Sequence, residues 1–113
     1  FPNYTRNTKV TIAWSDGATK EQKLEKIITQ KWIANYPMGI EAWTEYRRTG
    51  YPELAPVIDN LSNGVITNNA RGLRRLRYSY KEHTLNKDNY AAAVSLLGGK
   101  DDESVDLFWA KKN

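Results

Sequence analysis

Two glutamates, Glu41 and Glu45, are four residues apart in a segment with helical spacing, so their side chains should lie on one face of a helix. Paired carboxylates are the groups that most glycoside hydrolases use to cleave a sugar linkage. The same spacing, with Arg48 close by, is also that of a solvated helix face on which carboxylates pair with cations. Because that arrangement is far commoner, we expect Glu41 and Glu45 to be surface residues and not catalytic residues.

The chain has a single histidine, His83, whose ordinary pKa near neutrality would suit a general base. Neighbouring Glu82 would point away from it in an extended segment, and neither a Gly-x-Ser-x-Gly motif nor a cysteine nucleophile accompanies it. We therefore interpret His83 as a surface or structural residue. Gly98-Gly99-Lys100 lacks the spacing of a phosphate-binding loop. The sequence predicts no catalytic residue, no metal site and no cofactor.

An arginine-rich run from Arg71 to Lys81 is the best candidate for contact with nucleic acid, because arginines pair with phosphates and interleaved aromatics can stack on bases. The net charge of +4 gives this interpretation modest support. However, Leu73 and Leu76 indicate that part of the run is buried, and arginine binds buried carboxylates bidentately. We expect a structural role, in which at least one arginine pairs with a carboxylate or with loop carbonyls: Arg47, Arg48, Arg74 or Arg75.

Aromatic residues are the remaining chemical signal, with 4 Trp and 7 Tyr in 113 residues. Their flat faces could stack on sugar rings. Each tryptophan also stands where core packing would place one, so the sequence does not distinguish the two roles: Trp14, Trp32, Trp43 and Trp109.

Two helices are predicted in the first half of the chain. Thr19 and Gln22 form a capping box that should begin a helix ending near Tyr36, before Pro37. A second helix should run from Gly39 to Arg48, with Gly50 at its end. The inward faces are expected to carry these residues: Leu24, Ile27, Ile28 and Trp32 in the first helix, and Ile40, Trp43 and Tyr46 or Arg47 in the second.

Outside the helical pair, only one more helix is predicted, opened by Asn86 and ended by Gly98-Gly99. Its apolar face should hold Tyr90, Ala93, Val94 and Leu97. Residues 1–9 read as an extended lead-in, and Val10 to Trp14 alternate as in a short strand. The aromatic tail around Leu107-Phe108-Trp109 should be packed against something.

Residues 51–84 have little periodicity, although Val57-Ile58 and Val65-Ile66 could pair as a minor β-hairpin around Asn63-Gly64. A structureless stretch of this length is unusual within a small compact domain. We expect it to wrap a larger body, so that residues 1–113 would be incomplete on their own.

A family resemblance appears between Gln30 and Pro52, which read QKWIA, EAW and RRTGYP in that order. This segment resembles the signature near the C-terminus of SusD/RagB-like proteins, in the branch described as SusD-like starch-binding outer-membrane lipoproteins. The run RRLRY from Arg74, Glu82, and the closing GGKD and LFW segments resemble that family as well. Ser79 stands where the family often has proline. The matches extend from about residue 19 to residue 109.

The resemblance implies a mainly α fold, with a helical pair, a third helix and irregular wrapping segments, as the C-terminal portion of a tetratricopeptide-like SusD domain. It implies a non-enzymatic protein that captures oligosaccharides or polysaccharides at the surface of a Gram-negative outer membrane. Its partners would be a TonB-dependent SusC-like transporter and the remaining N-terminal part of the same protein, with a lipid anchor upstream and no nucleic acid. Most glycan-binding residues are expected upstream. Two alternatives stay open: a small basic nucleic-acid-binding domain and a fragment of a glycoside hydrolase.

Overall fold

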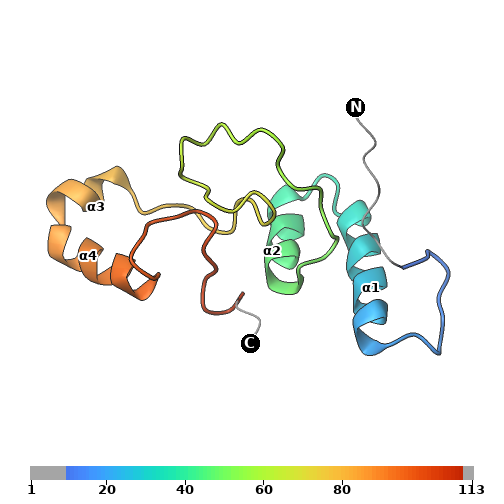
Figure 1. Ribbon diagram of the computed structural model, residues 1–113. Helices are drawn as coiled ribbons and strands as arrows, with labels where there is room; N and C mark the ends of the chain where they lie inside the picture. The colour runs from blue at the N-terminus through green and yellow to red at the C-terminus, as the bar shows by residue number, and fades with distance from the viewer. Residues whose placement is uncertain (1–9, 111–113) are drawn as a thin grey trace. The chain divides into compact units, whose positions relative to one another are not determined.

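The computed structural model describes residues 10–110, so the expected lead-in at residues 1–9 lies outside the described residues. Within this range the chain forms four helices and no strand: α1 (Lys20–Ala34), α2 (Gly39–Thr49), α3 (Tyr80–Leu85) and α4 (Lys87–Leu96) (Figure 1). The described residues divide into an N-terminal unit, residues 10–55, and a C-terminal unit, residues 56–110. The prediction of a mainly helical chain is confirmed.

Helix α1 begins at the predicted capping box. The Gln22 amide N–H donates to Thr19 Oγ1 at 3.2 Å, and the Thr19 N–H donates to Gln22 Oε1 at 2.9 Å. These reciprocal bonds satisfy two backbone donors that a helix start otherwise leaves without partners. The helix ends at Ala34, slightly earlier than predicted, where the Asn35 N–H still bonds the Lys31 carbonyl at 2.8 Å.

Helix α2 ends as predicted at Gly50, which adopts a left-handed backbone with φ of 80° and donates its N–H to the Tyr46 carbonyl. Helices α1 and α2 lie side by side (Figure 1). The rings of Trp32 and Tyr46 meet edge to face, with centroids 6.3 Å apart. Ile28 and Ala42 are buried, but Ile27, which was predicted to face inward, is 54% exposed. The predicted helical pair is therefore joined by aromatic and aliphatic contacts.

The inward face of α2 differs from the prediction. Ile40 is 77% exposed, because the buried residues of the helix are Ala42, Arg47 and Thr49. The prediction that Tyr46 or Arg47 faces inward is confirmed by Arg47, which is 9% exposed. Trp43 is half-buried instead of lying in the core. The Arg47 guanidinium stacks on its ring, 3.6 Å from the centroid.

The predicted β-hairpin is not formed. Asn63 and Gly64 do make a turn, with φ of 53° and 81°. However, the Val65 carbonyl accepts a hydrogen bond from the Glu103 N–H at 3.0 Å, and the Val57 N–H donates to the Asn69 carbonyl. The backbone groups that a hairpin would have paired with each other are thus used by more distant partners.

The strand predicted for Val10 to Trp14 is also absent, since this segment is a loop in the structure. Its polar groups are directed to α1: the ammonium of Lys26 donates to the Ala13 carbonyl and to Thr11 Oγ1. The loop is therefore held by hydrogen bonds from a helix side chain, and not by the backbone of a neighbouring strand.

Helices α3 and α4 contact each other in the C-terminal unit. The structure adds α3, which the sequence did not predict; it starts where Ser79 Oγ accepts the Lys81 N–H at 3.3 Å. Asn86 precedes α4 as predicted, but its side-chain oxygen accepts from Asn89 Nδ2 and makes no backbone cap. The predicted apolar face of α4 is the half-buried one: Tyr90, Ala93, Val94 and Leu97.

Few apolar side chains are buried within residues 10–110: Ile28, Ala42 and Ala110. Many large apolar side chains are exposed in both units, for example Tyr36 and Leu85. In the tail, Leu107 is half-buried but Phe108 is 87% exposed, so the expected packing of this segment is met only in part. None of the helices in the described range combines the length and apolar character of a membrane span.

Candidate functional site

The arginine run lies against the acidic segment 101–106, forming an arginine–aspartate cluster of Arg71, Arg74, Arg75, Asp101 and Asp106. Arg74 Nε donates to Asp106 Oδ1 at 2.8 Å, Arg71 pairs with the same carboxylate, and Arg75 pairs with Asp101. Arg74 and Arg75 are 5% and 4% exposed. Although burial opposes ionisation, hydrogen bonds from the two arginines lower the pKa of Asp106 below its ordinary value.

Backbone hydrogen bonds run alongside these ion pairs. The N–H groups of Arg74 and Arg75 both donate to the Glu103 carbonyl, at 2.7 and 3.1 Å. On the N-terminal unit, Arg48 Nη2 donates to Glu45 Oε2 at 2.6 Å. The prediction that at least one of the four named arginines pairs with a carboxylate is therefore confirmed, and Arg74 and Arg75, which are buried in their ion pairs, are structural.

Asp102 is a further buried carboxylate, 6% exposed, next to Asp101 in the chain. It accepts hydrogen bonds from the hydroxyl of Thr67 and from both the N–H and the hydroxyl of Ser104. Burial alone would raise the pKa of this carboxyl group, but the hydrogen bonds from Ser104 and Thr67 outweigh it and lower the pKa to about 2. Asp102 thus stays ionised and joins two loops.

His83 lies in a stack of rings. Its imidazole is 4.1 Å from the ring centroid of Tyr90, it also stacks on Tyr80, and its Nε2 is 3.8 Å from Asp101 Oδ2. Asp101 already pairs with Arg75 and accepts the Tyr78 N–H at 3.2 Å. This environment fits the structural role expected of the histidine, which packs on rings beside a carboxylate that other groups already bind.

Glu41 and Glu45 do lie on one face of α2, as predicted, and both reach Lys31 of α1. The ammonium is 2.8 Å from Glu41 Oε1 and 3.3 Å from Glu45 Oε1. The hydrogen bond to Glu41 is the main cause that raises the pKa of Lys31. The hydrogen bond from Arg48 is the main cause that lowers the pKa of Glu45, and burial opposes it. A carboxylate held ionised in this way is a poor proton donor near neutral pH.

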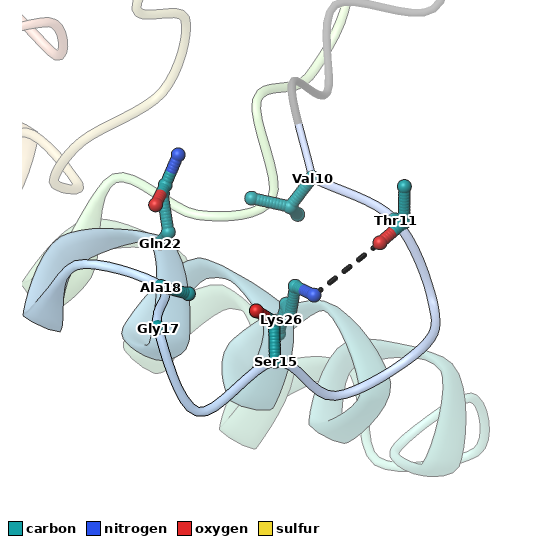
Figure 2. A pocket seen from close by; sticks show the side chains of 7 residues that line it. All are labelled: Val10, Thr11, Ser15, Gly17, Ala18, Gln22 and Lys26. Carbon is teal, nitrogen blue, oxygen red and sulfur yellow. Dashed lines mark hydrogen bonds between the residues drawn. The ribbon is translucent and has the colours of Figure 1, made fainter.

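An open cavity of about 380 Å³ lies in the N-terminal unit, between the loop that precedes α1 and the helix itself (Figure 2). Figure 2 shows the Lys26 side chain reaching from α1 towards Thr11 of the loop, to which its ammonium donates a hydrogen bond. Lys26 is only 9% exposed. The lining combines hydroxyls, an amide and small residues: Val10, Thr11, Ser15, Gly17, Ala18, Gln22 and Lys26.

Sequence reasoning missed Lys26 and the roles of Asp102 and Asp106. The sequence does contain an acidic run, Asp101-Asp102-Glu103, and its charge opposite to that of the arginine run was the available signal for the cluster. Lys26 gave no signal, because a lysine on a helix is ordinarily exposed. Residues 10–110 contain no group of three or more His, Asp or Glu side chains placed to hold a metal ion.

Comparison with protein families gives a match that extends over residues 2–110. The matching family is the SusD-like family, described as Susd and RagB outer membrane lipoproteins. No match was found among the curated proteins.

Several solved structures resemble the chain closely. A SusD homologue from Bacteroides uniformis is 48% identical with a TM-score of 0.83, and the match covers 97% of this chain and 23% of that one. A chitin-binding SusD homologue from Flavobacterium johnsoniae is 48% identical with a TM-score of 0.76, covering 91% and 21%. A SusD-like protein from Bacteroides thetaiotaomicron is 47% identical with a TM-score of 0.81, covering 97% and 22%. The chain therefore spans less than a quarter of the length of these relatives.

Proposed function

The chain belongs to the SusD-like family of outer-membrane lipoproteins, and from that premise we propose that it is part of a cell-surface protein that binds glycans. Residues 1–113 would be the C-terminal portion of a SusD-like domain and would not be complete alone. The observation that carries this proposal is the family match over residues 2–110, together with 48% identity to a chitin-binding homologue. The limited coverage of the relatives supports the view that more of the domain lies outside this chain.

The role proposed for the chain within that protein is that of a scaffold. Several of its buried polar side chains bind each other, as Arg75 binds Asp101 and Asp102 binds Thr67 and Ser104. Most residues that contact the glycan would lie outside this chain. The exposed apolar side chains of both units would be covered by the remainder of the polypeptide, because contiguous exposed apolar surface usually marks a contact.

We propose that the protein captures its ligand without cleaving it and passes it to a SusC-like, TonB-dependent transporter. Capture for transfer calls for weak and reversible binding. A lipid anchor upstream of this chain would hold the protein on the outer face of the outer membrane. Nothing in this role needs a metal or a cofactor.

The two alternative functions have lost support. A nucleic-acid site built on the arginine run would need its arginines on one exposed face, but Arg74 and Arg75, at the centre of the run, are buried in ion pairs with aspartates. A glycosidase site would need one carboxylic acid that can hold a proton, but Glu41 and Glu45 both bind the Lys31 ammonium.

Calorimetry with a panel of neutral oligosaccharides, including chitooligosaccharides, tests the proposal on the full-length protein and on this chain alone. We expect the full-length protein to bind at least one of them and this chain to bind it far more weakly. Equal affinity of the two would place the site here and contradict the scaffold role. Release of reducing sugar, abolished by Glu41→Gln or Glu45→Gln, would contradict a non-enzymatic function.

A further inference from the structure

Lys26 is a buried cation that forms no ion pair with any carboxylate of residues 10–110. Its ammonium donates to Thr11 Oγ1 and the Ala13 carbonyl, both neutral acceptors. The remaining residues, 1–9 and 111–113, contain neither aspartate nor glutamate. Because charged side chains are rarely buried without a partner, an anion from outside the chain should complete this site.

The nearest acidic side chain on the loop is already engaged. Asp16 accepts a hydrogen bond from Trp14 Nε1 at 2.9 Å through its carboxylate, and its backbone carbonyl accepts from Lys23. The loop is thus held on α1 by two lysines that bind carbonyl oxygens, Lys23 and Lys26. This arrangement fixes the Lys26 ammonium in the wall of the cavity.

The ammonium of lysine has three hydrogens, and two of them are directed at Thr11 and Ala13. The third is available for an oxygen in the adjoining cavity. The cavity is also lined by the hydroxyl of Ser15, by the small surfaces of Val10 and Ala18, and by the side-chain amide of Gln22, whose oxygen accepts the Thr19 N–H (Figure 2). The volume of about 380 Å³ falls in the range of small-ligand sites, roughly 300–1,000 Å³.

We propose that this cavity binds the carboxylate of an acidic sugar, such as a uronate unit of an oligosaccharide, through Lys26. The proposal rests on the proposed function in glycan capture and refines its ligand class. The ammonium would bind the carboxylate, and Ser15 and Gln22 would bind the hydroxyls of the same sugar. This contact adds one subsite for an acidic unit, while most of the glycan is bound elsewhere in the protein.

The same carboxylate chemistry has a second source, an aspartate or glutamate from the part of the polypeptide beyond this chain. The two sources of the carboxylate would be distinguished by the property of the protein that each one changes. A ligand carboxylate changes affinity for acidic glycans only, whereas a side-chain carboxylate changes the stability of the protein in the absence of any glycan.

The test uses the full-length protein and its Lys26→Gln variant, with an oligogalacturonate and a chitooligosaccharide of equal length as probes in calorimetry. Lys20→Gln serves as the matched control, because it removes one lysine charge from an exposed position of the same helix. We expect Lys26→Gln to lose about tenfold or more in affinity for the oligogalacturonate, as a charge-assisted hydrogen bond implies. Affinity for the neutral probe and the behaviour of Lys20→Gln should stay unchanged.

A measurement on the wild-type protein covers the case in which Lys26→Gln does not fold. Its unfolding temperature should rise with the oligogalacturonate and should not rise with the methyl ester of the same oligosaccharide. If neither the variant nor esterification changes binding of the acidic probe, the proposal is wrong. If Lys26→Gln lowers only the unfolding temperature, Lys26 serves the stability of the protein alone and the sugar subsite is excluded. Binding of the chitooligosaccharide in either case leaves the proposed glycan capture intact.

Discussion

In the N-terminal unit, the backbone is organised by contacts that are mostly close in sequence, whereas in the C-terminal unit it is organised by polar contacts between distant segments. The first unit has a capped helix, a glycine stop and an aromatic pair between two consecutive helices. The second joins Arg75 to Asp101 and Thr67 to Ser104, which are 26 and 37 residues apart. Stability in the second unit should therefore depend on a few charged side chains.

The largest effect is expected from Arg75→Ala. The substitution leaves the Asp101 side chain, 7% exposed, without its main counter-charge. Breaking a buried ion pair by removing one partner costs about 3–5 kcal/mol. Hydrogen exchange of the backbone amides of Arg74 and Glu103 would measure the loss, with the amides of α1 as the internal reference.

Arg77→Ala is the matched control for that substitution. Its guanidinium is 48% exposed and 3.7 Å from Glu103, so its removal should cost less than about 1 kcal/mol. Equal effects of the two substitutions would show that burial of the ion pair does not set the stability of the C-terminal unit.

In the N-terminal unit, the most damaging single change should be Ile28→Ala. Ile28 is 4% exposed and is one of the few buried apolar side chains in the described range. Truncation of a buried isoleucine costs about 2–5 kcal/mol, and the exposed surroundings of this unit favour the lower half of that range. Ile33→Ala, at a position 62% exposed on the same helix, is the control for urea unfolding followed by circular dichroism.

Acid should open the C-terminal unit before it opens the N-terminal one. The pKa of Asp102 is about 2 in the folded chain, against an ordinary value of 3.8. A depressed pKa contributes stability at pH values above the ordinary value, and that stability is lost as pH falls from about 4 to about 2. The expected loss is about 1.5–3 kcal/mol, the range for hydrogen bonds to a charged group.

Asp102→Asn should remove most of that pH dependence. Amide exchange of Ser104, measured between pH 5 and pH 2, would follow the change directly. A profile that is the same in wild type and Asp102→Asn would assign the acid sensitivity to other carboxylates, such as Asp106, whose pKa is also lowered.

The smallest effect tests the local contacts of the N-terminal unit. Thr19→Ala removes the hydroxyl that accepts the Gln22 N–H and should cost about 1 kcal/mol. Thr19→Ser keeps the acceptor and should behave like the wild type. Circular dichroism of the two variants during urea unfolding separates these outcomes, and equal midpoints would show that the cap is dispensable.

The comparison of the two units also explains what the sequence could predict. Signals for α1 and α2 lie within a few residues of each helix end, as with Thr19, Gln22 and Gly50, so both helices were predicted nearly to their bounds. Helix α3 was missed because it is short and has no apolar stripe. The prediction of a hairpin was wrong because the Val65 carbonyl accepts a hydrogen bond from the Glu103 N–H, a partner that no local pattern indicates.

In the candidate sites as well, features that depend on local sequence were predicted and contacts between distant residues were not. Arg74 and Arg75 were correctly interpreted as structural, but the stated reason was wrong, since Leu73 and Leu76 are 37% and 68% exposed. Their partners Asp101 and Asp106 could not be assigned, since nothing in the spacing of the chain specifies which carboxylate a given arginine reaches. Lys26 is the clearest case: its burial depends on a loop that folds onto α1 in place of the predicted strand.

The hydrogen bond from the Tyr78 N–H to Asp101 Oδ2 closes residues 79–100 into a loop whose two ends are adjacent. Helices α3 and α4 both lie within residues 79–100 and contact each other. Closing a chain segment costs entropy that rises only slowly with its length. The segment can therefore be lengthened, shortened or exchanged during evolution with little penalty, provided that the residues at its two ends keep their bond. Variation in helix length among related proteins should accumulate here, while Tyr78 and Asp101 mark the fixed points at which such exchanges begin and end.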